Sequence, residues 1–338
     1  MIQSSPYVRK EASVTRVMSE VCLALLPGIA VYTWLIGPAI LLQIAIATAA
    51  ALAGEAVMLK IRGKPLGLFL CDGSAVVTAW LIALTFPPLA PWWLIAGGTL
   101  FAIVVAKHLY GGLGQNPFNP AMIAFAACIV SFPALMSQWP SQDLHLAFGE
   151  QFRIVFGFTP ALDGLSAATP LDALKTALKQ GEGSASVATI LANSQTFGHF
   201  AGRGWEWLTL AYLVGGLWLW QRRIITWHVP LGFIGAIVLL SGGLWLYDAK
   251  QFASPLFHLF SGGVMLGAFF IATDPVSGST TPRGKIIFGA GCGLIAYIIR
   301  VFGGYPDGVA FAVLLLNICA PLISLLTQPP IYGAKDGK

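Results

Sequence analysis

The feature that most constrains this chain is a succession of apolar runs, each close to the length that crosses a membrane. About 20 mostly apolar residues in a helix span the hydrocarbon core of a bilayer. Ten runs approach this length, some of them interrupted by Gly or Pro: 21–37, 39–58, 68–86, 92–107, 119–136, 207–221, 228–247, 255–272, 285–301 and 308–326. Because a helix satisfies its own backbone polar groups in lipid, we expect an all-α polytopic membrane protein with about ten transmembrane helices.

The scarcity of charge agrees with this class. Charged residues make up 10% of the 338 residues, against roughly 25% in a typical soluble domain. This composition excludes a soluble enzyme, a disordered chain and a disulfide-stapled secreted domain. The polar segment 1–20 has no short apolar core or cleavage site, so we expect no cleavable signal peptide.

The basic residues predict the orientation, because positive charge concentrates in cytoplasmic segments. With the N-terminus inside, 13 of the 19 basic residues lie in cytoplasmic segments. They are Arg9, Lys10, Arg16, Lys60, Arg62, Lys64, Lys107, Arg222, Arg223, Arg283, Lys285, Lys335 and Lys338. We therefore expect both termini in the cytoplasm of a bacterium, the spans in its inner membrane, and segment 137–206 in the periplasm. The positive charge is assigned to this membrane face, and we expect no nucleic-acid partner.

The two halves of the sequence resemble each other. Ala79-Trp-Leu-Ile-Ala83 matches Ala268-Phe-Phe-Ile-Ala272 at an offset of 189, and Pro120 with Ile123-Ala-Phe-Ala126 matches Pro306 with Val309-Ala-Phe-Ala312 at an offset of 186. The matched spans run in opposite directions, which indicates two inverted five-helix repeats. Chance similarity between apolar helices is the alternative. The expected divisions are 1–20 (cytoplasmic segment), 21–136 (first repeat), 137–206 (loop), 207–326 (second repeat) and 327–338 (cytoplasmic tail).

Polar residues at the spans are the candidates for ion handling. Inverted repeats often form a site near the bilayer midplane from broken helices, and the segments 111–120 and 303–308 combine Gly, Pro and polar residues as such breaks do. Ordinary loops would show the same composition. The candidates for a path of ions or a second flavin are Glu55, Asp72, Lys107, Asn116, Asn119 and Asp274, with Asn317 as a further polar residue. Intramembrane ionisable groups suggest function, although residues at helix ends also reach the interface.

The segment 137–206 is too long for a bare connection and is expected to have structure of its own. Phe152, Ile154, Phe156 and Phe158 alternate, which favours a short strand or a segment on the membrane surface. Thr169-Pro-Leu-Asp172 predicts a helix start, with Thr169 as N-cap and Pro170 as the first helical residue. Cysteines and histidines show no metal-ligand spacing, so we expect no metal site.

Within that segment, Asp163-Gly-Leu-Ser-Ala-Ala-Thr169 resembles a flavinylation motif, approximately Asp-Gly-x-Ser/Thr-Gly-Ala-Thr/Ser. Ala167 stands where that motif usually has Gly. The stretches DGSAVVTAWLIALTFPP, LYGGLGQNPFNPAM, SAATPLDAL and FFIATDPVSGSTTPRGK resemble the family that contains the D component of the Rnf complex and the related B component of the sodium-translocating NADH:quinone reductase. The resemblance covers residues from about 20 to 330.

The resemblance implies a cofactor and its attachment point. A flavin transferase would link FMN to Thr169 through a phosphoester. Asp163, Ser166 and Ala168 would serve recognition by the transferase or contact the flavin. The flavin ring would rest near apolar residues at the membrane surface, with Phe156 and Phe158 as candidates. Some members of the family also hold a second, non-covalent flavin (riboflavin or FMN).

The resemblance further implies a function. The chain would be one subunit of a multisubunit ion-translocating oxidoreductase of the ferredoxin/NAD type, inactive alone, which relays electrons coupled to Na⁺ or H⁺ movement. Its partners would be the other membrane and peripheral subunits, the flavin transferase and the lipid bilayer. The alternatives are a solute or ion transporter with a midplane site and no covalent flavin, and a structural scaffold without a cofactor.

Overall fold

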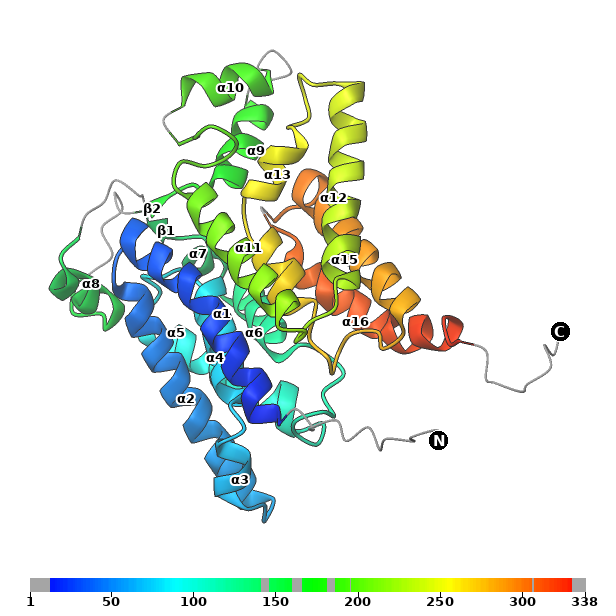
Figure 1. Ribbon diagram of the computed structural model, residues 1–338. Helices are drawn as coiled ribbons and strands as arrows, with labels where there is room; N and C mark the ends of the chain where they lie inside the picture. Colours follow the sequence, from blue (N-terminus) through cyan, green and yellow to red (C-terminus); the bar gives the residue numbers. More distant parts are fainter. Residues whose placement is uncertain are drawn as a thin grey trace.

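Most of the chain is helical (Figure 1). The computed structural model describes residues 13–140, 146–159, 166–180, 186–194, 196–305 and 307–329. Among these residues, five helices are long and apolar enough to cross a membrane: α1 (Val14–Leu35), α2 (Ala39–Ile61), α12 (His228–Tyr247), α15 (Pro282–Phe302) and α16 (Val309–Leu326). The expected class, a helical integral membrane protein, is confirmed.

The other expected spans are shorter or divided. Helices α4 (Ser74–Thr85), α6 (Pro120–Ser131) and α11 (Trp205–Gln221) have 12, 12 and 17 residues. Helix α5 (Trp92–Phe101) continues as the π-helical segment η1 (Ala102–His108), and α6 is followed by the short α7 (Pro133–Met136).

The expected spans 68–86 and 255–272 are both interrupted by a break of three residues. The first consists of α3 (Leu66–Leu70) and α4, and the second of α13 (Pro255–Phe260), α14 (Val264–Leu266) and the π-helical η3 (Gly267–Ile271). Gly73 and Gly262 lie in the two breaks with φ of 79° and 64°. Glycine adopts this left-handed conformation without the steric cost that other residues meet. Each break therefore contains a glycine at the position that needs this conformation.

Glycines let the long helices approach closely. On α15, a Cβ at Gly289 would overlap the Val229 carbonyl oxygen, and one at Gly293 would overlap the Phe233 carbonyl oxygen. Both carbonyls belong to α12. Small residues four apart allow this kind of backbone contact between helices in lipid.

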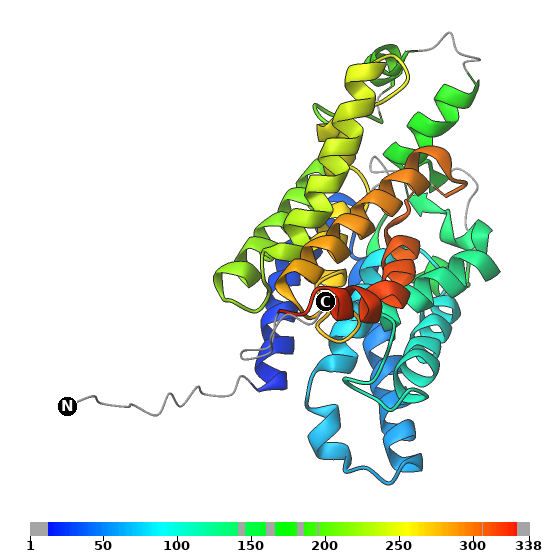
Figure 2. The same ribbon diagram turned by 90° about the vertical axis from the view of Figure 1, so that its right-hand side faces the viewer.

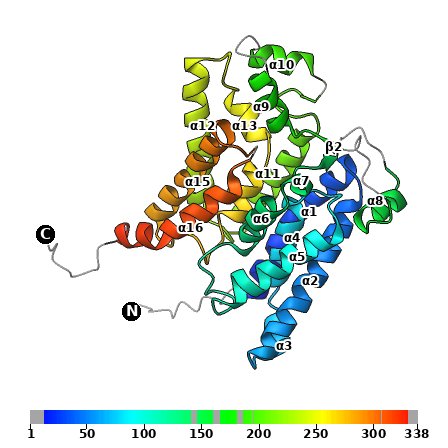
Figure 3. The same cartoon turned by 180° about the vertical axis from the view of Figure 1, so that it is seen from behind.

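Segment 137–206 packs at one end of the helices. It contains β1 (Trp139–Pro140), α8 (Phe148–Val155), β2 (Ser166–Ala167), α9 (Pro170–Gln180) and α10 (Val187–Asn193). Helices α9 and α10 lie at the upper end of the molecule and α3 at the lower end, and the other two views keep this order (Figures 1, 2 and 3). The segment therefore has structure of its own, as expected.

Two expectations about this segment need correction. The phenylalanine alternation does not form a strand, because Phe152 and Ile154 lie in helix α8. The class is also not strictly all-α, because β1 and β2 form an antiparallel pair in which Trp139 lies opposite Ala167. Short-range alternation failed here because α8 contains only 8 residues, too few for periodicity to separate helix from strand.

Candidate functional site

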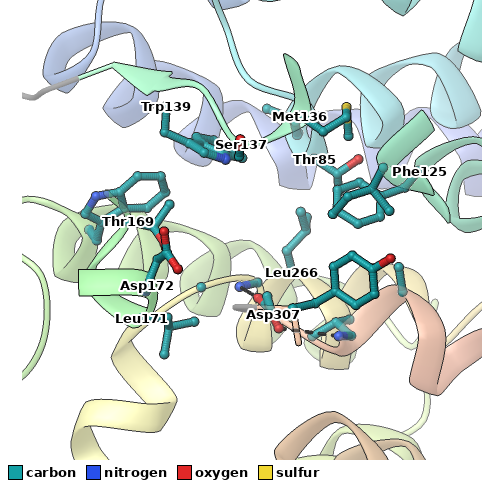
Figure 4. Close-up of a pocket in the computed structure, with 18 of the residues that line it drawn as sticks. Thr85, Phe125, Met136, Ser137, Trp139, Thr169, Leu171, Asp172, Leu266 and Asp307 are labelled. Carbon is teal, nitrogen blue, oxygen red and sulfur yellow. Dashed lines mark hydrogen bonds between the residues drawn. The ribbon is translucent and has the colours of Figure 1, made fainter. Parts of the chain in front are cut away.

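A cavity of about 480 Å³ lies where segment 137–206 meets the helices (Figure 4). We call it the loop-side cavity. Its walls come from both halves of the chain and from the segment itself, with Phe125, Trp139, Thr169, Trp205, Tyr212 and Tyr305 among the lining residues. Its volume is within the range of about 300–1,000 Å³ that is typical of ligand pockets.

Thr169 stands at the edge of this cavity as the N-cap of α9. The backbone N–H of Asp172 donates to Thr169 Oγ1 at 3.3 Å, and α9 begins at Pro170. The predicted cap and helix start are therefore confirmed. Both Thr169 and Asp172 line the cavity. The hydroxyl thus lies at a helix N-terminus, where unpaired backbone N–H groups and the helix dipole favour an anion.

The β1–β2 pair places the motif beside two tryptophans. Trp139 pairs with Ala167, and its ring meets the Trp205 ring edge to face with centroids 5.6 Å apart. Both rings line the loop-side cavity. These two tryptophans are at opposite ends of segment 137–206. Their contact depends on the tertiary fold and could not be predicted from local sequence.

The other aromatic side chains named from the sequence lie elsewhere. Phe156 lines a separate hollow with Trp92 and Trp93, and Phe158 is 71% exposed. Neither lines the cavity that contains Thr169. The expectation that a flavin on Thr169 would rest near apolar residues that include Phe156 or Phe158 stays a prediction, and neither side chain belongs to the wall around Thr169.

Of the remaining motif residues, Ala168 is exposed and Ser166 belongs to β2. Neither is among the lining residues of the cavity. Asp163 lies outside the described residues. The motif therefore contributes Thr169 to the cavity wall.

Lys175 fastens α9 to the second half of the chain. Its Nζ donates to the carbonyl oxygens of Arg300 at 3.3 Å and Tyr305 at 3.2 Å, and also to that of Gly303. These carbonyls lie at and beyond the end of α15, where the last carbonyls of a helix lack partners. Partial burial, and then the charge of Lys179, lower the pKa of the Lys175 amine. The contact was not foreseen from the sequence.

Arg300 and Asp307 stabilise the adjoining wall. Arg300 is 4% exposed. Its Nη2 donates to Asp307 Oδ1 at 3.1 Å, and its Nη1 donates to the His258 carbonyl oxygen at 2.8 Å. Asp307 Oδ2 accepts from the Gly263 N–H at 2.7 Å. These bonds join the break before α16 to the break before α14.

A second, smaller cavity of about 140 Å³ lies near the basic segments. We call it the basic-side cavity. Four residues selected from the sequence line it: Lys107, Asn116, Asn119 and Asp274. Lys107, Asn116 and Asn119 come from η1 and the adjoining 109–119 break, whereas Asp274 follows η3 in the other half of the chain. The structure therefore brings these four candidates together.

The other two candidates connect to this cavity through a buried chain of polar contacts. Lys107 Nζ donates to Glu55 Oε1 at 2.9 Å and Oε2 at 2.8 Å, and to Ser74 Oγ at 2.8 Å. Ser74 Oγ donates in turn to Asp72 Oδ1 at 2.6 Å. Glu55 and Lys107 are each 2% exposed. The interpretation of Glu55 and Lys107 as residues at the membrane interface is wrong, because their charges neutralise each other inside the protein.

His108 belongs to the same network. Its Nε2 lies 3.1 Å from Glu55 Oε1, and its Nδ1 lies 3.1 Å from Arg62 Nη1. Since arginine can only donate, a neutral imidazole accepting at Nδ1 carries its proton on Nε2, which faces Glu55. The signal available in the sequence was its place directly after Lys107 at the end of an apolar run.

Asn119 and Asn317 join the two halves of the chain between the cavities. Asn119 Oδ1 caps α6 by accepting from the Ala121 and Met122 N–H groups, and its Nδ2 donates to the Ile271 carbonyl oxygen at the end of η3. Asn317 Oδ1 accepts from the Asn119 N–H at 3.0 Å. One amide thus satisfies the ends of two helices, which are the groups that a broken helix leaves unpaired.

The same joint forms a thin partition between the two cavities. Met122 and Ile271 line the loop-side cavity, whereas Ala121 and Phe270 line the basic-side cavity. Ala121 and Met122 are neighbours in sequence, and so are Phe270 and Ile271. The cavities are therefore back to back, and each reaches the start of α6 and the end of η3.

Comparison with known proteins agrees with the motifs and the helical architecture. The sequence profile described as the NQR2, RnfD, RnfE family matches residues 1–333. The chain belongs to the NQR2, RnfD, RnfE family. The resemblance inferred from the sequence is confirmed.

Relatives within this family are similar over almost their whole length. A protein of Pseudomonas aeruginosa is 50% identical over 336 residues, covering 99% of this chain and 96% of its own. Proteins of Escherichia fergusonii and Yersinia pseudotuberculosis are 46% and 48% identical over 351 residues, covering 99% of both chains. Each relative is named as the D component of an ion-translocating oxidoreductase complex.

Proposed function

We propose that the chain is the membrane-embedded D component of an ion-translocating oxidoreductase complex and relays electrons coupled to Na⁺ or H⁺ movement. Its family and the names of its relatives support this role. Its partners are the other membrane and peripheral subunits of such a complex, the lipid bilayer, and a flavin transferase during maturation. The chain alone is inactive, because electrons must reach it from one neighbouring protein and leave it to another.

The chain carries FMN covalently on Thr169 through a phosphoester. The observation that carries this proposal is the position of the Thr169 side chain, at a helix N-terminus and on the wall of a 480 Å³ cavity. A plain N-cap requires the hydroxyl but has no need of the cavity. Asp163, Ser166 and Ala168 then serve recognition by the transferase.

The residues around the cavity fit the group. Trp139, Trp205 and Phe125 supply apolar and aromatic surface to hold a planar ring, and the start of α9 supplies the positive end of a helix dipole for the phosphate. When bound, the flavin supplies one- and two-electron redox chemistry. Lys175 and Arg300 hold α9 and the adjoining wall in place.

The buried network of Glu55, Lys107, Asp72 and Ser74 forms part of the ion path, together with Asn116, Asn119 and Asp274. The basic-side cavity opens onto this network through Lys107 and Ser74. Its volume of about 140 Å³ suits an ion with a few waters. A second, non-covalent flavin at this place would require the walls to separate, because the volume is below that of most ligand pockets.

The chain folds as two inverted five-helix repeats, 21–136 and 207–326, with segment 137–206 in the periplasm and both termini in the cytoplasm of a bacterial inner membrane. The starts of corresponding elements support the repeat: α3 and α13, α4 and α14, α5 and α15, and α6 and α16 each begin 189 or 190 residues apart. The position of α9 and α10 opposite α3, which adjoins the basic segment 60–64, supports the orientation (Figure 1).

The test compares Thr169→Ala with Thr169→Ser in cells that also express a flavin transferase. Serine retains the hydroxyl, so covalent flavin fluorescence should remain with the polypeptide on a denaturing gel. Alanine removes the acceptor and should abolish that fluorescence. As a lost N-cap alone, the alanine variant costs about 1 kcal/mol, so it should still insert and fold.

Two results would contradict the proposal at different levels. Fluorescence retained by the alanine variant would refute Thr169 as the attachment site. A wild-type chain without covalent flavin, despite an active transferase, would refute the cofactor. It would favour a transporter in which the two cavities bind a solute or ion.

A further inference from the structure

Two tyrosines of the loop-side cavity have hydroxyl groups that the described part of the chain leaves without a hydrogen-bond partner. Tyr32 on α1 is 1% exposed and Tyr212 on α11 is 5% exposed, and both line the cavity. Neither Oη has a partner among the described residues. Both Oη atoms are covered by their neighbours, so adjacent side chains must shift before a ligand reaches them. Because an unsatisfied buried hydroxyl costs free energy, two such hydroxyls on residues that line one cavity point to a ligand that accepts hydrogen bonds.

The packing around these tyrosines holds the rings in place. A Cβ at Gly28 would overlap Tyr212 Cε1, so the Tyr212 ring lies directly on α1, one helical turn before Tyr32. The Tyr212 ring also meets the Phe270 ring edge to face with centroids 6.3 Å apart. Phe270 lines the basic-side cavity, so Tyr212 marks the end of the loop-side cavity at the partition.

The cavity therefore has different chemistry in its parts. Thr169 and Asp172 lie where segment 137–206 forms the wall, Trp139 and Trp205 give aromatic surface, and the two phenols come from membrane helices. A planar molecule with a polar edge would fit this cavity: its flat faces would contact the tryptophans, and its polar edge would contact the two phenols. The flavin ring has such an edge, with carbonyl oxygens and ring nitrogens that accept hydrogen bonds.

We propose that Tyr32 and Tyr212 bind the pyrimidine edge of the flavin ring by donating their hydroxyl hydrogen bonds to it. The proposal rests on the covalent flavin at Thr169 proposed above and adds the residues that orient its ring. Hydrogen-bond donors at this edge favour the negative charge that the ring carries when reduced. The two tyrosines therefore also raise the reduction potential of the flavin.

The experiment removes one hydroxyl at a time and keeps the ring. Tyr32→Phe and Tyr212→Phe are compared with Tyr297→Phe in the full-length chain, produced with and without the flavin transferase. Tyr297 on α15 is the matched control, because it is 2% exposed and its Oη also lacks a described partner. It lines neither the loop-side nor the basic-side cavity.

With flavin attached, Tyr32→Phe and Tyr212→Phe should shift the visible absorption band, move the midpoint potential to more negative values and lower the melting temperature. Without flavin, the same variants should not lower the melting temperature, because each removes an unsatisfied hydroxyl. Tyr297→Phe should leave the band and the potential unchanged, and should change the melting temperature equally in both preparations. Covalent flavin content should be the same in all variants.

Two outcomes separate this proposal from the one it rests on. If the wild-type chain holds covalent flavin but Tyr32→Phe and Tyr212→Phe behave as Tyr297→Phe does, the tyrosine assignment is overturned and the attachment at Thr169 stands. If the wild-type chain holds no covalent flavin with an active transferase present, both are overturned.

Discussion

Glu55 and Lys107 are buried charges whose stability depends on each other. Their side chains are each 3% exposed, and the charged atoms lie 2.8 Å apart. We expect Glu55→Gln and Lys107→Met each to lower the free energy of unfolding by about 3–5 kcal/mol, because each leaves the other charge unpaired. The double variant should be less destabilised than the sum of the two, as measured by thermal unfolding in detergent. Lys60→Met, an exposed lysine of α2, is the control. Additive effects would show that the pair is not coupled.

At the scale of residues, the sequence showed which polar side chains are unusual but not which residues they contact. Glu55, Lys107 and Asn119 stand out as polar residues in apolar runs, and the structure buries all three. Their partners could not be derived, because Lys107 and Glu55 are 52 residues apart and Asn119 and Asn317 are 198 apart. Thr169 could be recognised because capping is local: the bond from Asp172 spans three residues.

Helix α15 depends on two glycines for its contact with α12. Gly293→Ala places a Cβ against the Phe233 carbonyl oxygen, so the helices must separate, and overpacking of this kind costs typically about 1–3 kcal/mol. Gly235→Ala on α12 meets nothing within 4 Å and should be neutral or stabilising by up to about 1 kcal/mol from helix propensity. The melting temperatures of the two variants should therefore move in opposite directions. A Gly293→Ala variant as stable as Gly235→Ala would contradict this account of the packing.

Long periodic elements could be predicted and interrupted ones could not. The expected limits 39–58 and 228–247 agree with α2 and α12 to within a few residues, because apolar length is a strong signal. The breaks within 68–86 and 255–272 are short, and only Asp72 and Gly73 in the first and Ser261, Gly262 and Gly263 in the second hint at them. The π-helical turns of η1 and η3 depend on packing between helices, which a single sequence does not contain.

The α9 end and the α3 end of the molecule should face opposite sides of the membrane. We expect Lys179→Cys, near the end of α9, to react with an impermeant thiol reagent in cells whose outer barrier is open, and Lys64→Cys to react only after lysis. Both lysines are exposed in the structure. The variants need a background in which the exposed Cys71 and Cys319 are replaced by Ser. The opposite labelling pattern would refute the orientation and remove the flavin site from the periplasmic face.

At the scale of the molecule, composition and charge pattern predicted the class, and the motif predicted the family. The two cavities were beyond the sequence, since each is lined by residues from both halves of the chain. The aromatic wall shows the limit most clearly. Phe156 and Phe158 are close to Thr169 in sequence, but Trp205, 36 positions after Thr169, is the residue that reaches the cavity.

The bond between Asn119 and Asn317 also sets an order of events during biosynthesis. Asn119 is separated by 198 residues from the side chain that accepts its N–H bond. At a synthesis rate of about 5–20 residues per second, the ribosome needs roughly 10–40 s to supply Asn317 after Asn119 has been made. During that time the first half of the protein resides in the bilayer with an unfinished polar joint. A chain that ends before Asn317 lacks the acceptor of this bond, so the start of α6 stays without its contact to the second half.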